Sequence, residues 1–380
     1  MFAFDFQPRT HIVSGLGSIG KIGTLAHDLG FRRALLVADR GVVDAGHVRT
    51  ATSHLESAGI GVVPFHDFSE NPDSAMAEAG RAFAAPLDID AIVGLGGGSS
   101  LDCAKAINFL LTNGGQMADY RGYGKATRPL LPMIGIPTTA GTGSEAQSYA
   151  VIADAATHMK MACGAPSAAV KVAILDAELT LTAPRPVTAM AGFDAVAHAD
   201  ETAVSIRRTA FSEMLSREAW RLLTGAFERA LRQPTDLEAR AAMQVGAHLA
   251  GMAIEQSMLG AAHACANPLT ARYNLSHGLA LAMLLPQVVR WNASVASDGY
   301  AALLGTPRRR ATDSDPADTL ARRLEDLATF GGLPTRLSSS GVDEDSLPDL
   351  AAQAAEQWTG TFNPRPFDAK GALDIYRAAM

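Results

Sequence analysis

The chain has 380 residues, of which 48% are hydrophobic and 19% charged, and its formal net charge is −7. This length and composition predict about two domains with a large buried core, and they exclude a wholly disordered protein. The acidic balance disfavours a nucleic-acid groove or an anionic membrane surface as the main binding partner, so we expect neither.

The cysteines and the N-terminus indicate the compartment. The three cysteines are widely spaced and form no CxxC pair, which is typical of a reducing environment; they are Cys103, Cys163 and Cys265. The stretch MFAFDFQPRT lacks the basic and apolar regions of a signal peptide. The chain has no run of about 18 uninterrupted apolar residues, so no membrane-spanning helix is predicted. We therefore expect a cytoplasmic protein.

Strand and helix patterns alternate over the first half of the chain. Apolar runs predict strands at 32–39, 59–67, 90–96, 132–139 and 169–176, with a hairpin near 150–163. Helical spacing fills the intervals, and one helix begins at Asn71-Pro72-Asp73. Continuous apolar strands that alternate with helices indicate a parallel sheet covered on both faces. We predict an α/β domain over residues 1–182.

The pattern changes near Thr182-Ala183-Pro184, and almost no strand signals follow. Helices are predicted at 186–203, 209–232, 235–257, 260–271, 278–293, 316–331, 343–356 and 366–378. Turn residues such as Gln233-Pro234-Thr235 separate them. Residues 183–380 are thus predicted to form an all-helical domain. The polar tract TPRRRATDSDP, residues 306–316, is expected to be an exposed connection.

Two glycine-rich turns are alternative phosphate-binding loops. SGLGSIG, residues 14–20, matches the dinucleotide fingerprint G-x-G-x-x-G, but the strand before it is short. GLGGGSSLDCAK, residues 94–105, follows a buried strand and opens a helix. Its backbone N–H groups, the positive end of the helix and the hydroxyls of Ser99 and Ser100 suit a pyrophosphate. We favour this second loop.

Polar side chains follow two further strands at the same edge of the predicted sheet. The loop IPTTAGTGSEAQS, residues 136–148, offers several hydroxyls to a ribose or phosphate: Thr138, Thr139, Thr142 and Ser144. Asp39 ends its own strand at that edge. A carboxylate there accepts hydrogen bonds from ribose hydroxyls and repels a 2′-phosphate. NAD is therefore predicted in preference to NADP.

Histidines and a carboxylate in the second half suit a metal ion. Asp194 and His198, in GFDAVAHADE, are four residues apart, so a helix places them on one face. His263 and His277 lie in GAAHACANPLTARYNLSHG, which has few other polar groups. One carboxylate and three imidazoles suit Fe²⁺, Zn²⁺, Ni²⁺ or Co²⁺, and do not suit Ca²⁺ or Mg²⁺. Such an ion would act as a Lewis acid toward a substrate oxygen.

Together these motifs resemble the iron-containing (group III) alcohol dehydrogenase family. The resemblance extends over nearly the whole chain and includes GGGSSLDCAK, PTTAGTGSE, KVAILDAELT, GFDAVAHADE, HGLALAMLLPQVVRWN and NPRP at 363–366. It implies an α/β nucleotide-binding domain followed by a helical domain, an architecture similar to that of dehydroquinate synthase. It also implies that SGLGSIG is an N-terminal turn and not the phosphate loop.

The resemblance implies roles for individual residues. The divalent metal, Fe²⁺ in this family, would be bound by Asp194, His198, His263 and His277. The pyrophosphate would lie on Gly96, Gly97, Gly98 and Ser99. The other implied cofactor contacts are Asp39 at the adenosine ribose, Asn71 near the adenine, Asp102 toward the nicotinamide, Lys160, and Thr138, Thr139 and Thr142 along the cofactor.

One position departs from the family pattern. Many members carry a second histidine, facing the substrate, one turn after the first metal histidine, where this chain has Asn267. An amide can hydrogen-bond a substrate oxygen but cannot carry a proton near pH 7. We expect the proton to leave through a water chain or a ribose hydroxyl instead.

The resemblance implies an NAD(P)-dependent, metal-dependent alcohol dehydrogenase or aldehyde reductase, an oxidoreductase acting on CH–OH groups, in a homodimer or larger homo-oligomer. Two alternatives stay open. A reductase of a specialised carbonyl, such as maleylacetate or a phosphonate aldehyde, would need a basic group for the extra anion, and Arg272 is the candidate. A non-catalytic NAD-binding protein would bind the dinucleotide without turning it over.

Overall fold

A computed structural model of the chain describes residues 4–305 and 315–380. The chain divides into two compact units, Phe6–Ala183 and Pro184–Met380, and the second unit also includes Phe4 and Asp5. The boundary lies one residue beyond residue 182, the predicted end of the α/β domain. Of the predicted connection 306–316, residues 306–314 lie outside the described residues, and the rest begins a helix.

A six-stranded parallel sheet forms the centre of Phe6–Ala183, with the strand order β1-β9-β6-β4-β2-β3. Its strands are β1 (His11–Ser14), β2 (Arg33–Val37), β3 (Gly61–Phe65), β4 (Ala91–Gly96), β6 (Met133–Pro137) and β9 (Val172–Leu175). Every residue of β4, β6 and β9 is buried, because the sheet is covered on both faces. A smaller sheet has the order β5-β8-β7 and consists of β5 (Gly122–Tyr123), β8 (Lys160–Gly164) and β7 (Tyr149–Ala153).

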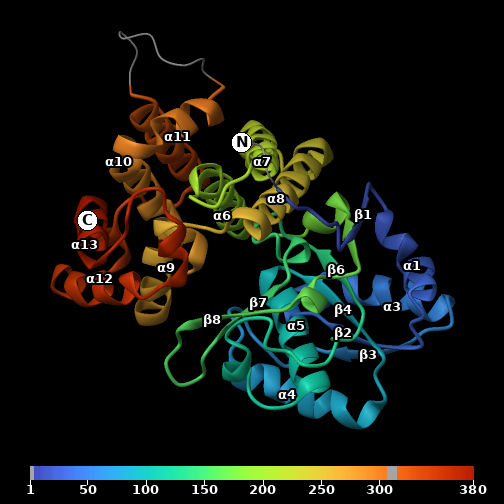
Figure 1. Ribbon diagram of the computed structural model, residues 1–380. Helices are drawn as coiled ribbons and strands as arrows, with labels where there is room; N and C mark the ends of the chain where they lie inside the picture. The colour runs from blue at the N-terminus through green and yellow to red at the C-terminus, as the bar shows by residue number, and fades with distance from the viewer. Residues whose placement is uncertain (1–3, 306–314) are drawn as a thin grey trace. The chain divides into compact units, whose positions relative to one another are not determined.

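Helices pack on both faces of the large sheet (Figure 1). One core cluster joins the sheet to α1 (Ile22–Asp28) and α3 (His47–Ser57), and another joins it to α4 (Ser74–Ala84) and α5 (Gly98–Asn113). The short α2 (Arg40–Asp44) follows β2. The 3-10 turns of this unit are η1 (Ser18–Lys21), η2 (Ala85–Leu87), η3 (Met117–Tyr120), η4 (Ser144–Ala146), η5 (Pro166–Ala168) and η6 (Ala177–Thr180). The predicted doubly covered parallel sheet is confirmed, whereas β5 was not predicted because two residues give no periodicity.

The described part of Pro184–Met380 is built from helices. The α-helices are α6 (Arg185–Val204), α7 (Ala210–Arg232), α8 (Leu237–Ser257), α9 (Ala261–Tyr273), α10 (His277–Leu303), α11 (Pro316–Gly331), α12 (Leu347–Ala355) and α13 (Ala369–Ala379). The 3-10 turns are η7 (Leu337–Ser340), η8 (Glu344–Ser346) and η9 (Trp358–Phe362). α6 packs against α7, α8 and α10, and it is buried all round from Gly192 to Val204. α6 is therefore the central helix of this unit, and the predicted helical architecture is confirmed.

α10 is longer than predicted. The sequence predicts a helix over 278–293, whereas α10 continues to Leu303 through a stretch that contains Ser, Asp and Gly. Ala296, Tyr300 and Leu303 are buried at helical spacing, so packing outweighs the low helix propensity of this stretch. Among the described residues α10 alone is long and apolar enough to cross a membrane, and 61% of its most apolar window is buried inside the protein, as in a core helix.

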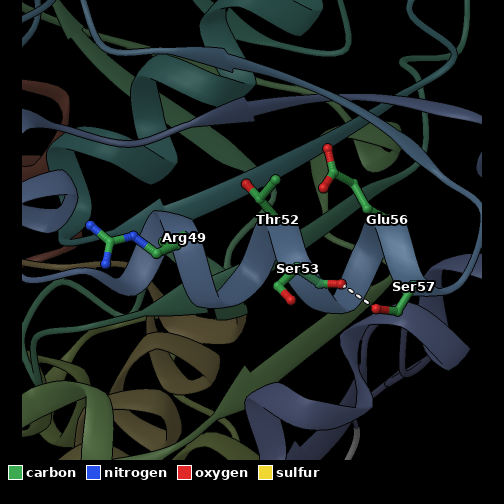
Figure 2. A pocket seen from close by; sticks show the side chains of 5 residues that line it. All are labelled: Arg49, Thr52, Ser53, Glu56 and Ser57. Atoms are coloured by element: carbon green, nitrogen blue, oxygen red, sulfur yellow. Dashed lines mark hydrogen bonds between the residues drawn. The ribbon is translucent and has the colours of Figure 1, made fainter.

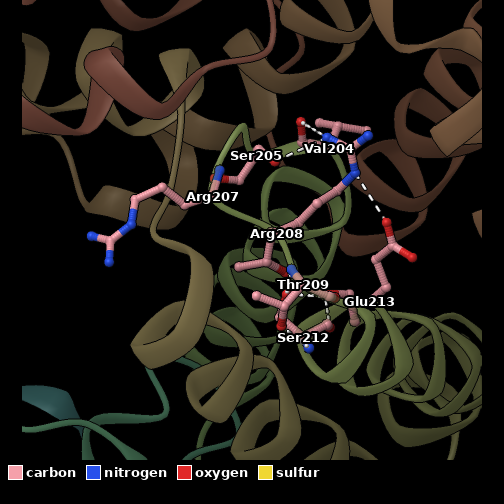
Figure 3. A network of polar contacts seen from close by, with 9 residues as sticks. Val204, Ser205, Arg207, Arg208, Thr209, Ser212 and Glu213 are labelled. Atoms are coloured by element: carbon pink, nitrogen blue, oxygen red, sulfur yellow. Dashed lines mark hydrogen bonds and ion pairs between the residues drawn. The ribbon is translucent and has the colours of Figure 1, made fainter. Parts of the chain in front are cut away.

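The turn between α6 and α7 is fixed by its own polar side chains (Figure 3). Arg208 donates hydrogen bonds to the carbonyl oxygens of Val204 and Ser205, and its Nε lies 3.0 Å from Glu213 Oε1. Thr209 opens α7 with a reciprocal cap. These bonds satisfy the carboxyl end of α6, the helix that carries Asp194 and His198.

Candidate functional site

Four side chains from three helices meet in the helical unit. Asp194 and His198 lie one turn apart in α6, His263 lies in the first turn of α9, and His277 begins α10. The ligand atoms of Asp194, His263 and His277 all lie within 4.8 Å of one another. His198 Nε2 is 3.3 Å from Asp194 Oδ1, and the His198 and His263 ring centroids are 4.9 Å apart. The structure thus brings all four predicted metal ligands together, and we call them the Asp–His cluster.

The cluster is buried and charged. Asp194, His198 and His263 are each about 95% buried, and His277 is half-buried. Burial alone would raise the pKa of Asp194, but His198, His263 and His277 outweigh burial and hold that pKa well below its ordinary value. Burial opposes the charged form of His263, yet Glu201 and Asp194 raise its pKa to about 9. A cation that enters the cluster must therefore displace the proton on His263.

Two atoms of the cluster fit a metal ion directly. Within residues 4–305 and 315–380, buried Asp194 Oδ1 and His263 Nε2 have no hydrogen-bond partner, although they lie 3.6 Å apart. Buried polar atoms are normally satisfied, so two unsatisfied atoms aimed at one point indicate an absent partner. Three imidazole nitrogens and one carboxylate oxygen form a donor set that suits a divalent transition metal.

In the α/β unit, the glycine loop after β4 and the threonine loop after β6 approach each other closely. The Thr138 N–H donates to the Gly96 carbonyl oxygen at 3.0 Å. A Cβ atom added to Gly98 would lie 2.5 Å from Thr142 Cγ2, and one added to Gly97 would lie 3.2 Å from Thr139 Oγ1. The structure therefore gathers these predicted cofactor residues at the carboxyl ends of neighbouring strands, around the N-terminus of α5.

Asp39 and the two serines of the glycine loop are already hydrogen-bonded. Asp39 caps α2 through Val42 N–H, and its Oδ2 accepts a 2.9 Å hydrogen bond from Ser100 Oγ. Ser100 is fully buried, so the expectation that its hydroxyl faces a phosphate is wrong. Ser99 Oγ accepts from the Asn71 N–H at 3.2 Å, which places Asn71 beside the glycine loop.

Asp102 belongs to a network that the sequence did not predict. Ser144 Oγ donates to Asp102 Oδ1 at 2.6 Å, and it accepts a hydrogen bond from Nζ of the fully buried Lys105 at 3.1 Å. Burial raises the pKa of Asp102, while Lys105, Ser144 and Lys160 act in the opposite direction. Lys160, the first residue of β8, is thus close enough to Asp102 to influence its charge.

The backbone N–H groups of the SGLGSIG turn are hydrogen-bonded within the protein. The N–H groups of Gly17 and Ile19 donate to the two carboxylate oxygens of Asp176, at 3.2 and 3.0 Å. Asp176 also accepts from the Glu178 N–H at 3.2 Å. Because an internal carboxylate takes the anion-binding N–H groups of this turn, the turn has little to offer a phosphate.

A hollow lies along the exposed face of α3 (Figure 2). It is lined by Arg49, Thr52, Ser53, Glu56 and Ser57. All five come from one helix, and Ser57 Oγ donates to the Ser53 carbonyl oxygen as an ordinary helical contact. None of the five is a predicted site residue, so the hollow adds nothing to the candidate site.

Asn267 lies one turn after His263 on α9. Its amide nitrogen donates to Gln357 Oε1 at 3.1 Å, which fixes the orientation of the amide. The substrate-facing role of Asn267 stays a prediction. An amide held in this way leaves its own oxygen as an acceptor, and it still carries no titratable proton near pH 7.

Comparisons with known proteins agree with this arrangement. The family model "Iron-containing alcohol dehydrogenase" matches residues 8–177, and the model "Fe-containing alcohol dehydrogenase family, C-terminal" matches residues 188–380. The chain belongs to the iron-containing alcohol dehydrogenase family. The family resemblance noted in the motifs is thereby confirmed, and members of this family are oxidoreductases that act on alcohols and aldehydes.

Relatives within the iron-containing alcohol dehydrogenase family match the whole chain. The NAD-dependent methanol dehydrogenase of Bacillus methanolicus is 31% identical over 378 residues, and the 1,3-propanediol dehydrogenase of Citrobacter freundii is 32% identical over 382 residues; each match covers 99% of both chains. A solved 1,3-propanediol oxidoreductase is 31% identical, covers 100% of both chains and superposes with a TM-score of 0.94. A sulfoacetaldehyde reductase from Bifidobacterium kashiwanohense, solved with NAD⁺, is 26% identical over 99% of this chain and 98% of its own, with a TM-score of 0.87.

The close approach of the two loops in this family member leads to a prediction. Gly98→Ala is expected to weaken NADH binding about tenfold or more, because the new methyl group overlaps Thr142 and overpacking of this kind costs about 1–3 kcal/mol. Fluorescence titration with NADH measures the change. Gly225→Ala is the matched control, since a Cβ there meets no atom within 4 Å. Equal NADH affinity for the two variants would show that the loops do not bind the cofactor together.

Proposed function

We propose that this chain is an NAD-dependent, divalent-metal-dependent alcohol dehydrogenase or aldehyde reductase. The Asp–His cluster carries the proposal, because buried Asp194 Oδ1 and His263 Nε2 lack a hydrogen-bond partner among the described residues and converge with two further imidazoles. Relatives named for methanol and 1,3-propanediol support a short alcohol or aldehyde as the substrate.

The Asp–His cluster would hold the metal. Fe²⁺ is the first choice because the family is iron-containing, and Zn²⁺ or another divalent transition metal is the alternative. When bound, the ion supplies Lewis-acid chemistry that stabilises negative charge on an alcohol or carbonyl oxygen. Burial of the cluster strengthens this electrostatic effect, because little water is present to screen it.

The loops of the α/β unit would hold NAD, which supplies the hydride chemistry. Backbone N–H groups at Gly96, Gly97 and Gly98 stand at the start of α5, where the helix dipole favours a diphosphate. Asp39 follows the neighbouring strand β2 as the N-cap of α2 and would accept hydrogen bonds from ribose hydroxyls while repelling a 2′-phosphate, so we propose NAD over NADP. Asn267 would orient the substrate without accepting its proton, which must leave by another route.

Arg272 gives little support to the alternative of an anionic carbonyl substrate. Its guanidinium lies 3.7 Å from Asp349, stacks near Tyr273 and is 43% exposed. A solvated, paired arginine is a poor anchor for a substrate anion. Since one similar structure is a sulfoacetaldehyde reductase, an anionic aldehyde still belongs in the substrate panel.

The test is a metal and cofactor reconstitution. The protein is stripped with a chelator, loaded with Fe²⁺ under anaerobic conditions or with Zn²⁺, Co²⁺ or Ni²⁺, and assayed by NADH absorbance with short alcohols and aldehydes; NADP(H) is tested in parallel. We expect activity to disappear on stripping and to return with at least one metal, with NAD(H) preferred.

Each contrary result has a distinct meaning. Turnover that survives stripping would contradict the metal role. NADH binding without turnover under any metal would favour a non-catalytic nucleotide-binding protein. We also propose a homodimer or larger homo-oligomer, which light scattering of the purified protein measures.

A further inference from the structure

Glu201 is a buried carboxylate beside the Asp–His cluster that the proposed function leaves without a role. It lies in α6, three residues after His198, and only 3% of its surface is exposed. Its Oε2 lies 2.5 Å from His263 Nδ1, and its Oε1 accepts a 2.6 Å hydrogen bond from the Ala262 N–H. One carboxylate thus holds both the His263 ring and the backbone of the first turn of α9.

The start of α9 is a crowded polar junction. The Ala261 N–H donates to Asn363 Oδ1 at 3.2 Å, next to the bond from Ala262 to Glu201. Gly260 precedes this turn, and a Cβ there would lie 3.0 Å from both Asn363 Oδ1 and Glu201 Oε1. Two side chains therefore cap the first free N–H groups of a 13-residue helix, and the anionic one is favoured by the helix dipole.

Asn363 is itself fixed by a reciprocal amide pair. Asn363 Nδ2 donates to Asn292 Oδ1 at 2.8 Å, and Asn292 Nδ2 donates to Asn363 Oδ1 at 3.1 Å; both residues are at least 96% buried. Arg365 adds two contacts to α10: it donates to the Trp291 carbonyl oxygen at 2.7 Å, and its guanidinium lies over the Trp291 ring at 4.0 Å from the ring centroid. The NPRP motif thus holds the N-terminus of α9 against α10.

The bond to Nδ1 decides which nitrogen of His263 faces the cluster. A carboxylate oxygen only accepts, so Nδ1 must carry the hydrogen. Once a cation has displaced the remaining ring proton, the Nε2 lone pair lies on the side of Asp194 Oδ1, 3.6 Å away. A carboxylate behind a ligating imidazole fixes the tautomer and increases its donor strength. Asp194 and Glu201 also supply two carboxylates, which offset the charge of a buried divalent cation.

We infer that Glu201 is a positioning residue for the metal site: it orients His263 through Nδ1 so that Nε2 is presented to the cation, and it fixes the start of α9 at the same time. The inference rests on the proposed metal role of the Asp–His cluster. Both oxygens of Glu201 accept, so an amide at this position can satisfy either Ala262 N–H or His263 Nδ1–H, but not both.

The test compares Glu201→Gln with Asp200→Asn. Asp200 is the matched control because it is the neighbouring buried carboxylate of α6 and undergoes the same chemical change. Co²⁺ affinity is measured by competition with a chromophoric chelator, and the Co²⁺ absorption spectrum reports the ligand geometry. We expect Glu201→Gln to bind Co²⁺ about 10–100-fold more weakly with an altered spectrum, while Asp200→Asn matches the wild type. NADH affinity should be the same in all three proteins.

The outcomes separate the inference from the proposed function. A wild-type protein that does not bind Co²⁺ overturns the proposed metal site. Wild-type binding with equal affinity and an identical spectrum in Glu201→Gln overturns the positioning role, even if the variant melts at a lower temperature.

A second measurement needs no variant and applies if Glu201→Gln does not fold. In the Zn²⁺-loaded wild-type protein with ¹⁵N-labelled histidine, NMR should show His263 protonated at Nδ1 and free of a proton at Nε2. A proton on Nε2 of His263 would overturn the inference.

Discussion

Asp194→Asn is expected to empty the metal site and to lower turnover about 1000-fold, because several kcal/mol of Lewis-acid stabilisation are lost with the ion. Asp194 Oδ1 lies 3.3 Å from His198 Nε2 and 3.6 Å from His263 Nε2, so it is the anionic centre of the cluster. Asparagine keeps the size of the side chain but removes its charge. Metal content by mass spectrometry and kcat with the best alcohol of the panel measure the two effects.

Asp200→Asn is the matched control for this prediction. Asp200 shares α6 and its burial with Asp194. Burial, followed by the neighbouring Glu201, raises the pKa of Asp200 well above its ordinary value. Burial thus favours the uncharged form of this carboxyl group, which a neutral amide resembles, and metal content and turnover should stay unchanged. Wild-type metal content in Asp194→Asn would exclude Asp194 as a ligand, whereas metal loss in both variants would point to general damage of α6.

The sheet and the helices of the second unit could be predicted because their signals are local. Strands such as Ala91–Gly96 and Met133–Pro137 are buried on both faces and are continuous apolar runs in the sequence. Asp194 and His198 share a helix face at a spacing that the sequence shows directly. The grouping of this pair with His263 and His277 rested first on their shared metal-binding chemistry and then on the family resemblance, and the structure brings the four together.

The supporting residues could not be predicted because their partners are distant in the chain. Glu201 and His263 are 62 residues apart, and Asn292 and Asn363 are 71 apart. In the sequence Glu201 is an ordinary helical acid and Asn363 an ordinary turn residue. The one local signal for Glu201 was its position three residues after His198, which places it on the histidine side of α6. The prediction for Ser100 was wrong for the same reason: its hydroxyl suits a phosphate, but the fold turns it toward Asp39, which is 61 residues away in the chain.

Lys105 in the α/β unit has a structural role that the sequence does not predict. It looks like an exposed lysine of α5, yet it is fully buried. Its Nζ lies within hydrogen-bond distance of four oxygens: the carbonyl oxygens of Ser144, Gln147 and Tyr149 at 2.6, 2.7 and 2.9 Å, and Ser144 Oγ at 3.1 Å. Ser144 and Gln147 lie at the end of the threonine loop and Tyr149 begins β7, so one ammonium group fastens the end of this loop to the helix that begins with the glycine loop.

Lys105→Met is therefore expected to lower the free energy of unfolding by about 3–5 kcal/mol, because methionine fills the space but leaves several buried carbonyl oxygens without a donor. NADH affinity should fall with it, since Thr138, Thr139 and Thr142 lose the anchor of their loop. Urea unfolding and NADH titration measure the two effects, with Lys171→Met as the control because Lys171 is an exposed lysine of the same unit. If both variants unfold within about 0.5 kcal/mol of the wild type, the ammonium group does not hold the loop. If Lys105→Met is destabilised but binds NADH normally, the contacts of Lys105 stabilise the unit without ordering the cofactor loop.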